Sequence, residues 1–254
     1  MTLLVVACFL VSLAVLLSMW ARQLRTRNAT SVDVGWSFSL TGMAVAYAIF
    51  ADGDPARRAL VGALAALWSA RLGWYLYSTR VRTAHGEDGR YAALRTEWGA
   101  AAPQRFFRVY VAQSVAATLF SLPLLAAMRG GALDSWAYAG VVIWMLAVAG
   151  ETIADRQLAT FRSRPDARGE VCRVGLWHWS RHPNYFFEWL HWFAYVLIGH
   201  AAVLTFIGPV VMLWLLLKGT GIPHTERQAL RSRGDKYREY MRTTSPFVPW
   251  PPAR

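Results

Sequence analysis

Seven apolar stretches divide most of this chain, and they constrain its fold more than any other feature. They lie near residues 2–21, 34–51, 58–78, 106–128, 133–154, 183–200 and 201–218. A helix needs about 20 mostly apolar residues to cross the ~30 Å hydrocarbon core of a bilayer. The sequence therefore predicts an all-α, polytopic integral membrane bundle of seven transmembrane helices in one domain, 1–254, with residues 219–254 as a basic tail. Gly208-Pro209 predicts a kink in the last span.

The basic residues predict the orientation of these spans. Of the 27 Lys and Arg residues, 23 fall in or beside the segments 22–33, 79–105, 155–182 and 218–254. Three fall in or beside the alternate loops, and Arg71 falls inside the third span. Because cytoplasmic loops carry the excess of Lys and Arg, we expect the amino terminus outside and the carboxyl terminus in the cytoplasm. The first stretch has no basic segment before it, and three arginines follow it, so we expect a retained helix rather than a signal peptide.

Composition excludes several other classes of protein. The chain is 55% hydrophobic and only 17% charged, and it has thirteen tryptophans, a residue that concentrates at membrane–water interfaces. Cys8 and Cys172 form no C-x-x-C motif, and six scattered histidines do not form metal-binding clusters, so we predict no metal site. The net charge of +12 is explained by topology and lipid headgroups, and no nucleic-acid-binding element is visible.

Ionisable side chains at membrane depth are costly, so each suggests a functional site. Asn184, Glu188, His191 and Tyr195 share one face of the sixth predicted span. This face either lines a ligand or forms a polar seam between helices.

Another polar pair, Glu151 and Asp155, ends the fifth predicted span, with Arg162 seven residues after Asp155. These carboxylates either serve a site or are merely solvated at the interface.

The segment 175–188, GLWHWSRHPNYFFE, is the most informative junction. Pro183 disfavours helical geometry at His182 and suits the first turn of a helix, so a helix should begin there. Helix amino termini attract phosphate, and Arg181 and Arg173 lie nearby in sequence. Alternatively, the arginines only follow the positive-inside rule.

The basic tail has a similar ambiguity. It carries His224, Arg227, Tyr237 and Tyr240 and ends in Ser-Pro-Phe-Val-Pro-Trp-Pro-Pro. It is either an interfacial amphipathic segment or a lid that folds back over a nucleotide.

These motifs resemble those of the steroid 5α-reductase and sterol reductase superfamily. The resemblance rests on Arg181-His-Pro-Asn-Tyr-x-x-Glu188 after Gly175-Leu-Trp, and on the tail from Glu226-Arg227 through Tyr237-x-x-Tyr240 to Pro-Phe-x-Pro-Trp. Bacterial steroid-5α-reductase-like proteins are most similar, with Val-Asp-Val-Gly-Trp at 32–36 and Glu-Asp-x-Arg-Tyr at 87–91. The likeness is specific in the last hundred residues and looser before them.

The resemblance implies a membrane reductase that binds NADPH from the cytoplasmic side. It assigns cofactor contacts to Asp155, Arg162, Arg181, Asn184, Tyr185, Glu188, His224, Arg227, Tyr237 and Tyr240. Arg173 and His182, which border the same junction, complete the predicted set. We expect Arg162, Arg173 or Arg227 to select the 2′-phosphate of NADPH over NADH.

The catalytic pattern departs from the family. Its Gln-Glu pair is missing, and Trp68 replaces the tyrosine three residues before Arg71. We therefore predict Asp33, Tyr75 and Tyr91 as catalytic candidates. Trp36, Trp68 and Arg71 are predicted to contact substrate. Arg71 either snorkels to the interface or pairs with Asp33, and we favour an Asp33–Arg71 pair with a tyrosine as the carbonyl donor.

The resulting hypothesis is reduction of an enone lipid, with the Δ4 double bond of a 3-oxo-Δ4 steroid as the favoured target. A donor at the carbonyl oxygen would stabilise the enolate that hydride transfer creates. We expect the inner membrane of a bacterium, lipid contacts and no nucleic acid. The alternatives are a methyltransferase of the isoprenylcysteine type that uses S-adenosylmethionine, and a cofactor-free lipid-binding or scaffold protein.

Overall fold

The computed structural model describes residues 1–82, 86–219 and 221–253, and throughout these ranges the regular elements are helices, without a named β-strand. The predicted all-α fold is confirmed. The chain divides into two compact units. Unit 1 comprises residues 1–133 with 202–205, and unit 2 comprises residues 134–201 with 206–254.

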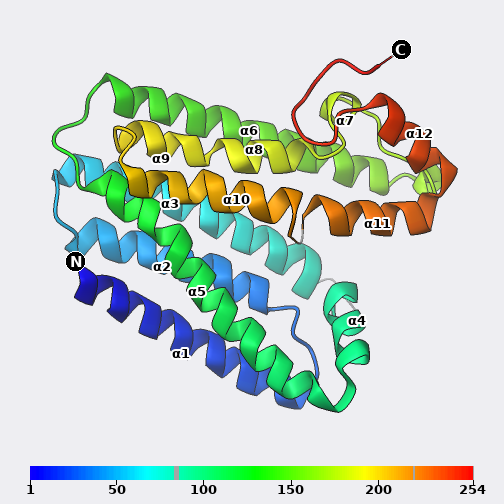
Figure 1. Cartoon of the computed structure of the whole chain (residues 1–254), viewed down its shortest axis with the longest axis horizontal. Coiled ribbons are helices and arrows are strands. Elements are labelled where there is room, and N and C mark those ends of the chain that lie inside the picture. Colours follow the sequence, from blue (N-terminus) through cyan, green and yellow to red (C-terminus); the bar gives the residue numbers. More distant parts are fainter. Residues whose placement is uncertain (83–85, 220, 254) are drawn as a thin grey trace. The chain divides into compact units, whose positions relative to one another are not determined.

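The described residues of unit 1 form five α-helices, coloured blue to green in Figure 1. They are α1 (Thr2–Thr26), α2 (Val32–Phe50), α3 (Pro55–Leu76), α4 (Gly89–Trp98) and α5 (Ala102–Met128). A π-helical turn over Tyr77–Val81 extends α3, and a 3-10 turn over Gly99–Ala101 leads into α5. Helix α2 packs against α1, α3 and α5.

Local sequence signals explain where α3 and α4 begin. The side chain of Asp54 accepts hydrogen bonds from the backbone N–H groups of Ala56 and Arg57, both at 3.0 Å, and Pro55 occupies the first turn. Asp88 caps α4 in the same way through the N–H of Arg90. Such caps satisfy the N–H groups that a helix start leaves without partners.

Small and hydroxyl-bearing residues allow close helix packing in unit 1. The hydroxyl of Tyr47 on α2 lies 2.9 Å from Ser121 Oγ on α5, and Thr41 lies 2.7 Å from Ser69 on α3. A Cβ atom at Gly62 would lie 2.6 Å from Ala48 Cβ, so glycine is needed for the close approach of α2 and α3. Hydrogen bonds between hydroxyls and small interface residues are the usual means of packing helices in lipid.

Unit 2 consists of one long helix and a series of shorter ones, followed by an extended carboxyl-terminal segment (Figure 1). Its helices are α6 (Ser135–Arg162), α7 (Leu176–Trp179), α8 (Pro183–Leu190), α9 (Trp192–Ile198), α10 (Ile207–Leu217), α11 (Ile222–Arg233) and α12 (Asp235–Thr243). Helix α6 packs against α8 and α9.

The sixth predicted span, 183–200, is two short helices rather than one. Helix α8 begins at Pro183, as predicted, but it ends at Leu190, and α9 begins at Trp192. The His191 ring nitrogen Nδ1 contacts the carbonyl oxygen of Glu188. In a continuous helix the N–H of Trp192 would use this carbonyl, so the histidine side chain competes with the helix at the break.

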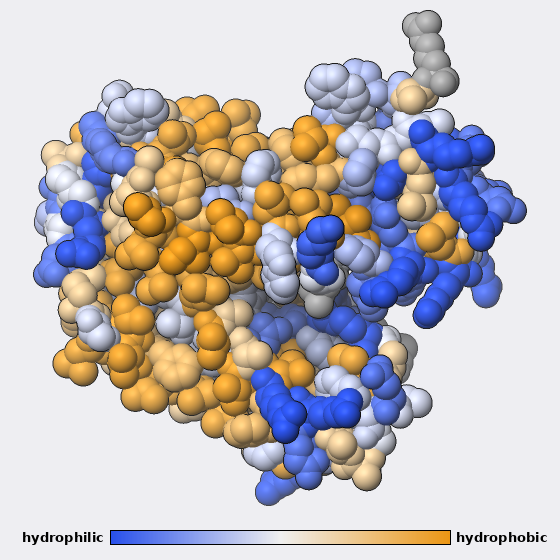
Figure 2. Space-filling model, viewed as in Figure 1, coloured by the Kyte–Doolittle hydropathy of each residue, from blue (hydrophilic) through white to orange (hydrophobic). Residues whose placement is uncertain are grey.

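Six helical segments are long and apolar enough to cross a membrane, judged by length and composition among the described residues. They are Thr2–Thr26, Val32–Phe50, Pro55–Val81, Gly89–Met128, Ser135–Arg162 and Val203–Arg233. The remaining predicted span, the sixth, is the divided pair α8 and α9, and it is not among these six segments. Exposed apolar side chains cover α1, α6 and α10, and Figure 2 shows hydrophobic residues over α6 and α10. The protein is therefore an integral membrane protein.

Gly208-Pro209 lies at the start of a helix and not at a kink within one. A 3-10 turn over Val203–Phe206 precedes α10, so Gly208 and Pro209 lie in the first turn of that helix. Proline is tolerated at this place because the first helical N–H groups have no intrahelical acceptor.

Candidate functional site

Unit 1 gathers charged side chains around Asp33, in the first turn of α2. Arg90 Nη2 lies 2.6 Å from Asp33 Oδ2, and the Tyr91 hydroxyl donates to Asp33 Oδ1 at 2.7 Å. The same Arg90 nitrogen donates to the Tyr91 oxygen at 2.7 Å. Gln113 Nε2 approaches Asp33 Oδ1 at 3.3 Å, and Arg80 Nη1 lies 3.8 Å from Oδ2. We call Asp33, Arg90 and Tyr91 the Asp33 group.

A second ion pair holds the start of α4 beside the segment before α2. Glu87 Oε1 accepts from the backbone N–H of Ala29 at 2.7 Å, and both Glu87 oxygens accept from Arg95. The backbone N–H of Asp88 donates to Thr30 Oγ1 at 2.7 Å. These contacts explain why two motifs about 55 residues apart in the chain form one group.

The structure changes the predicted partner of Asp33. We expected Arg71, but the guanidinium of Arg90 on α4 takes this place. Of the two tyrosine candidates, Tyr91 is the one that contacts Asp33, and Tyr75 lies partly exposed on α3. Of the predicted substrate-contacting residues, Trp68 is buried on α3 and Trp36 is half-buried on α2.

In unit 2, the junction 175–188 is anchored to the end of α6. The N–H of Leu176 donates to Gln157 Oε1 at 2.9 Å, and the indole N–H of Trp177 donates to the carbonyl of Ala154 at 2.8 Å. Gly175 has a φ of +56°, and a Cβ atom there would lie 2.1 Å from the Gln157 side chain. Only glycine fits this turn without strain.

Arg181 joins the junction to the basic tail. Its side chain is only 7% exposed. Arg181 Nε lies 2.7 Å from Glu226 Oε1 on α11, and Nη1 donates to the carbonyls of Met241 and Thr244, both at 2.8 Å. These contacts of the buried guanidinium hold the tail against the junction. The structure therefore gives Arg181 an internal role where we expected a pyrophosphate contact.

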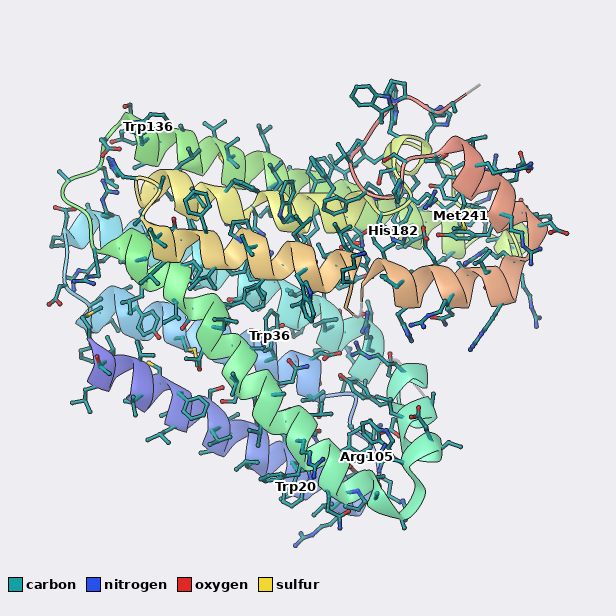
Figure 3. The ribbon with its side chains drawn as sticks, in the orientation of Figure 1. Trp20, Trp36, Arg105, Trp136, His182 and Met241 are labelled. Carbon is teal, nitrogen blue, oxygen red and sulfur yellow. The ribbon has the colours of Figure 1, made fainter. Side chains whose placement is uncertain are left out.

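His182 and Tyr185 continue this connection. Their rings stack with centroids 5.3 Å apart, His182 Nε2 lies 3.3 Å from Glu226 Oε1, and the Tyr185 hydroxyl lies 3.2 Å from Thr225 Oγ1. Figure 3 shows His182 near the start of α8. Burial lowers the pKa of His182 below its usual value, against the opposing effect of Glu226. His182 is therefore predominantly neutral near pH 7.

Asn184 is the polar side chain of α8 with an unused acceptor. Its Nδ2 donates to Asp155 Oδ1 on α6 at 3.1 Å, whereas its Oδ1 is buried and accepts no hydrogen bond from the described residues. A buried acceptor without a partner costs free energy unless a water or ligand satisfies it. Asp155 and Asn184, two of the residues predicted to contact the cofactor, therefore contact each other, and Glu188 is half-buried one turn after Asn184.

Other predicted cofactor residues divide into buried and exposed sets. Tyr237 and Tyr240 are buried in a small core of the tail with Ala229, and burial raises the pKa of both phenols. The Tyr240 hydroxyl donates to the carbonyls of Trp177 and Ser180. The more accessible residues are Arg162, Arg173, His224 and Arg227.

The other members of the predicted polar face, His191 and Tyr195, are fully buried in unit 2. The tail folds back onto the junction through contacts with Arg181 and Ser180, and the lid over a nucleotide stays a prediction.

Sequence reasoning missed the partners of the central carboxylate. Arg90 stood in a motif that was recognised, but no role was assigned to it, and Gln113 and Arg80 were not singled out. A pairing of Asp33 with Arg90 could have been proposed, because Asp33 is the one charged residue of 32–36 and Arg90 is the one basic residue of 87–91.

Comparison with known proteins places the chain in a family. The family described as "Protein of unknown function (DUF1295)" matches residues 19–244. The chain belongs to this family. It is also 24% identical over 261 residues to an uncharacterized protein of Schizosaccharomyces pombe, an alignment that covers 91% of this chain and 75% of that protein. No solved structure matches the chain.

The DUF1295 match covers the main charged contacts of both units. It includes the Asp33 group in unit 1 and the contacts of Arg181 with Glu226 in unit 2. It ends at Thr244, just before the extended carboxyl-terminal segment.

Proposed function

We propose that this protein is an NADPH-dependent membrane reductase of an enone lipid, with 3-oxo-Δ4 steroids as the favoured substrate class. The observation that carries the proposal is the buried, unsatisfied Oδ1 of Asn184 beside the Asp155 carboxylate. The carboxamide of a nicotinamide offers an N–H donor for such an oxygen. Bound NADPH would supply hydride to the β-carbon of the enone.

The arginines of unit 2 fit the phosphates of this cofactor. Burial raises the pKa of the Cys172 thiol, and Arg162 on α6 and Arg233 on α11 both oppose this rise. Arg233 Nε also donates to the carbonyl of Glu170 at 2.8 Å, so this side chain lies beside the segment that leads to Arg173. Clustered arginines suit a phosphate because each can donate two hydrogen bonds to it. Arg233 joins the predicted Arg162 and Arg173 as a candidate for the 2′-phosphate.

The Asp33 group fits the role of orienting a carbonyl donor. Arg90 pairs with Asp33 and also donates to the Tyr91 oxygen, so the phenol is fixed by two charged groups. In this proposal the single O–H of Tyr91, which donates to Asp33, would turn to donate to the substrate oxygen, and Asp33 and Arg90 are positioning residues. The donor then stabilises the negative charge that develops on that oxygen.

A methyltransferase that uses S-adenosylmethionine is the second candidate. One observation favours it: Arg181, the cation expected to neutralise a pyrophosphate at the start of α8, is occupied by Glu226 and two backbone carbonyls. The amino group of S-adenosylmethionine would also satisfy Asn184 Oδ1.

Binding measurements on the detergent-purified protein distinguish the two candidates. NADPH, NADH and S-adenosylmethionine are titrated against the parent protein and against Asn184→Ala, Glu188→Ala and the exposed control Gln228→Ala. Loss of a hydrogen bond to a buried ligand group costs about 1–3 kcal/mol, so NADPH binding should weaken in the first two variants and not in the control. Binding of S-adenosylmethionine alone would establish the second candidate. Parental NADPH affinity in both variants would refute the assignment of the cofactor to α8.

Cofactor preference tests the arginines separately. We expect tighter binding of NADPH than of NADH, and a smaller difference in Arg162→Ala or Arg233→Ala. Equal affinities for the two nucleotides in the parent protein would refute the 2′-phosphate assignment.

A further inference from the structure

The carboxyl-terminal segment 245–253 is a fixed element of unit 2. Ser245 forms a parallel β-bridge with Ser180, and its carbonyl accepts from the N–H of Arg181 at 2.8 Å. Ser180 Oγ donates to the carbonyl of Phe247 at 2.8 Å, and the N–H of Trp250 donates to the carbonyl of Trp179 at 2.9 Å. We call residues 245–253 the strap. Figure 1 shows the strap passing beside α7.

The strap has one buried and one exposed side. Phe247 is buried against the rings of Phe186 and Trp189, with centroids 5.8 and 5.6 Å away. Val248 and Trp250 are 49% and 69% exposed, and Trp179 of α7 is 44% exposed. The backbone hydrogen bond between Trp250 and Trp179 brings these two exposed residues side by side.

Helix α7, which ends at Trp179, is bonded to α6 where the apolar stretch of that helix ends. Helix α7 is bonded to Ala154 and Gln157 of α6. Ala154 ends the apolar stretch of that candidate span, and Asp155 and Arg156 follow it in the sequence. Tryptophan is enriched at this depth because its ring is apolar and its N–H is polar.

The excess of basic residues beside the strap favours a membrane with anionic lipids. Between residues 222 and 253 the chain carries six Lys or Arg and three Asp or Glu. Arg238 and Arg242 of α12 are exposed, and Figure 2 shows hydrophilic residues gathered over α11 and α12. A basic segment beside a bilayer is attracted to anionic headgroups.

We propose that Trp179, Val248 and Trp250 form an interfacial anchor that holds the tail on the surface of an anionic bilayer. The anchor buries its apolar side chains among the lipid headgroups, and the exposed arginines of α12 face the anionic lipids. The proposal is independent of the reductase assignment, since it uses none of the residues proposed to hold the cofactor.

The test places a fluorescent probe on the strap in nanodiscs. In a Cys8→Ser, Cys172→Ser background, Val248→Cys carries an environment-sensitive NBD label, with Trp250→Cys as a second site. The control is Asp166→Cys, on an exposed polar turn. In anionic nanodiscs with a spin label near the headgroups, we expect blue-shifted and quenched emission at both strap sites and neither effect at the control.

Two further results decide between lipid and other occupants. The strap signals should weaken in neutral nanodiscs, and Arg238→Gln with Arg242→Gln should reduce the difference between anionic and neutral lipid. Strap probes that behave like the Asp166→Cys control would overturn the proposal. So would strap probes that are shielded from a water-soluble quencher but insensitive to spin-labelled lipid, because a protein would then cover this surface. A signal equal in anionic and neutral nanodiscs would overturn the choice of anionic lipid.

Discussion

Replacement of Arg181 by alanine should release the carboxyl-terminal tail from the α7–α8 junction. The guanidinium makes an ion pair with Glu226 and donates to the carbonyls of Met241 and Thr244. Both charged side chains are largely shielded from water, with 7% and 13% of their surfaces exposed. The variant would leave the Glu226 carboxylate with neutral His182 as its remaining neighbour from the junction.

The expected cost follows from this burial. Removal of one partner from a buried ion pair typically costs about 3–5 kcal/mol, because the other charge stays in a poorly solvated place. Since 1.4 kcal/mol is a factor of ten, the equilibrium constant for tail opening should rise about 100- to 4,000-fold. Exchange of both charges for apolar groups, in Arg181→Met with Glu226→Leu, should recover part of this loss, because no buried charge remains unpaired.

Limited trypsin digestion measures this opening. Arg227, Arg231 and Arg242 are exposed cleavage sites in the tail, and cleavage follows the population of the open state when closing is faster than cleavage. The rate of cleavage in the tail should rise steeply in Arg181→Ala and less in the double variant. Arg164→Ala, which breaks the exposed pair with Asp166, is the control and should leave the rate unchanged. Tail cleavage of Arg181→Ala no faster than that of the parent would refute the tethering role of Arg181.

Three further predictions concern individual side chains. Arg90→Gln should lower the turnover of a 3-oxo-Δ4 steroid to the level of Tyr91→Phe, because both disturb the Asp33 group; parental turnover in both would remove this group from the reaction. Gly175→Ala should lower the melting temperature, because a Cβ atom in this left-handed conformation meets Gln157 and costs about 1–2 kcal/mol or more; an unchanged melting temperature would show that the turn adapts. Burial lowers the pKa of His182, so the unfolded chain binds its proton first as the pH falls. The stabilising contribution is therefore complete above pH 6.5, the ordinary histidine value, and declines below it. His182→Asn should flatten the pH dependence of the melting temperature below that value, and a parental pH profile in the variant would contradict the assignment.

The sequence was sufficient for the class of fold and for most helix positions. Long apolar runs specify membrane helices because the backbone in lipid must satisfy its own hydrogen bonds. The thickness of the bilayer sets the minimum length of such a run at about 20 residues. The start of α8 at Pro183 could also be predicted from local sequence, since proline fixes its own backbone angle and restricts the residue before it. The membrane orientation rests on the distribution of Lys and Arg and stays a prediction.

The division of the sixth span depended on a contact that the apolar pattern does not contain. A run of apolar residues from 183 to 200 fits one helix as well as two. The His191 side chain contacts the Glu188 carbonyl and competes for its place in the helix. This choice depends on a rotamer, and the rotamer is set by packing in the interior of unit 2.

The partners of charged residues were decided by tertiary structure alone. The sequence placed Asp33 at the start of the second span, Arg71 inside the third and Arg90 in the segment after it. Asp33 pairs with Arg90 because Glu87 and Asp88 fasten α4 to the segment before α2. In the same way, from the sequence alone Arg181 could serve a phosphate or the chain itself. Its burial beneath the folded tail assigns it to Glu226, because a charge removed from water is paired most favourably by the nearest opposite charge.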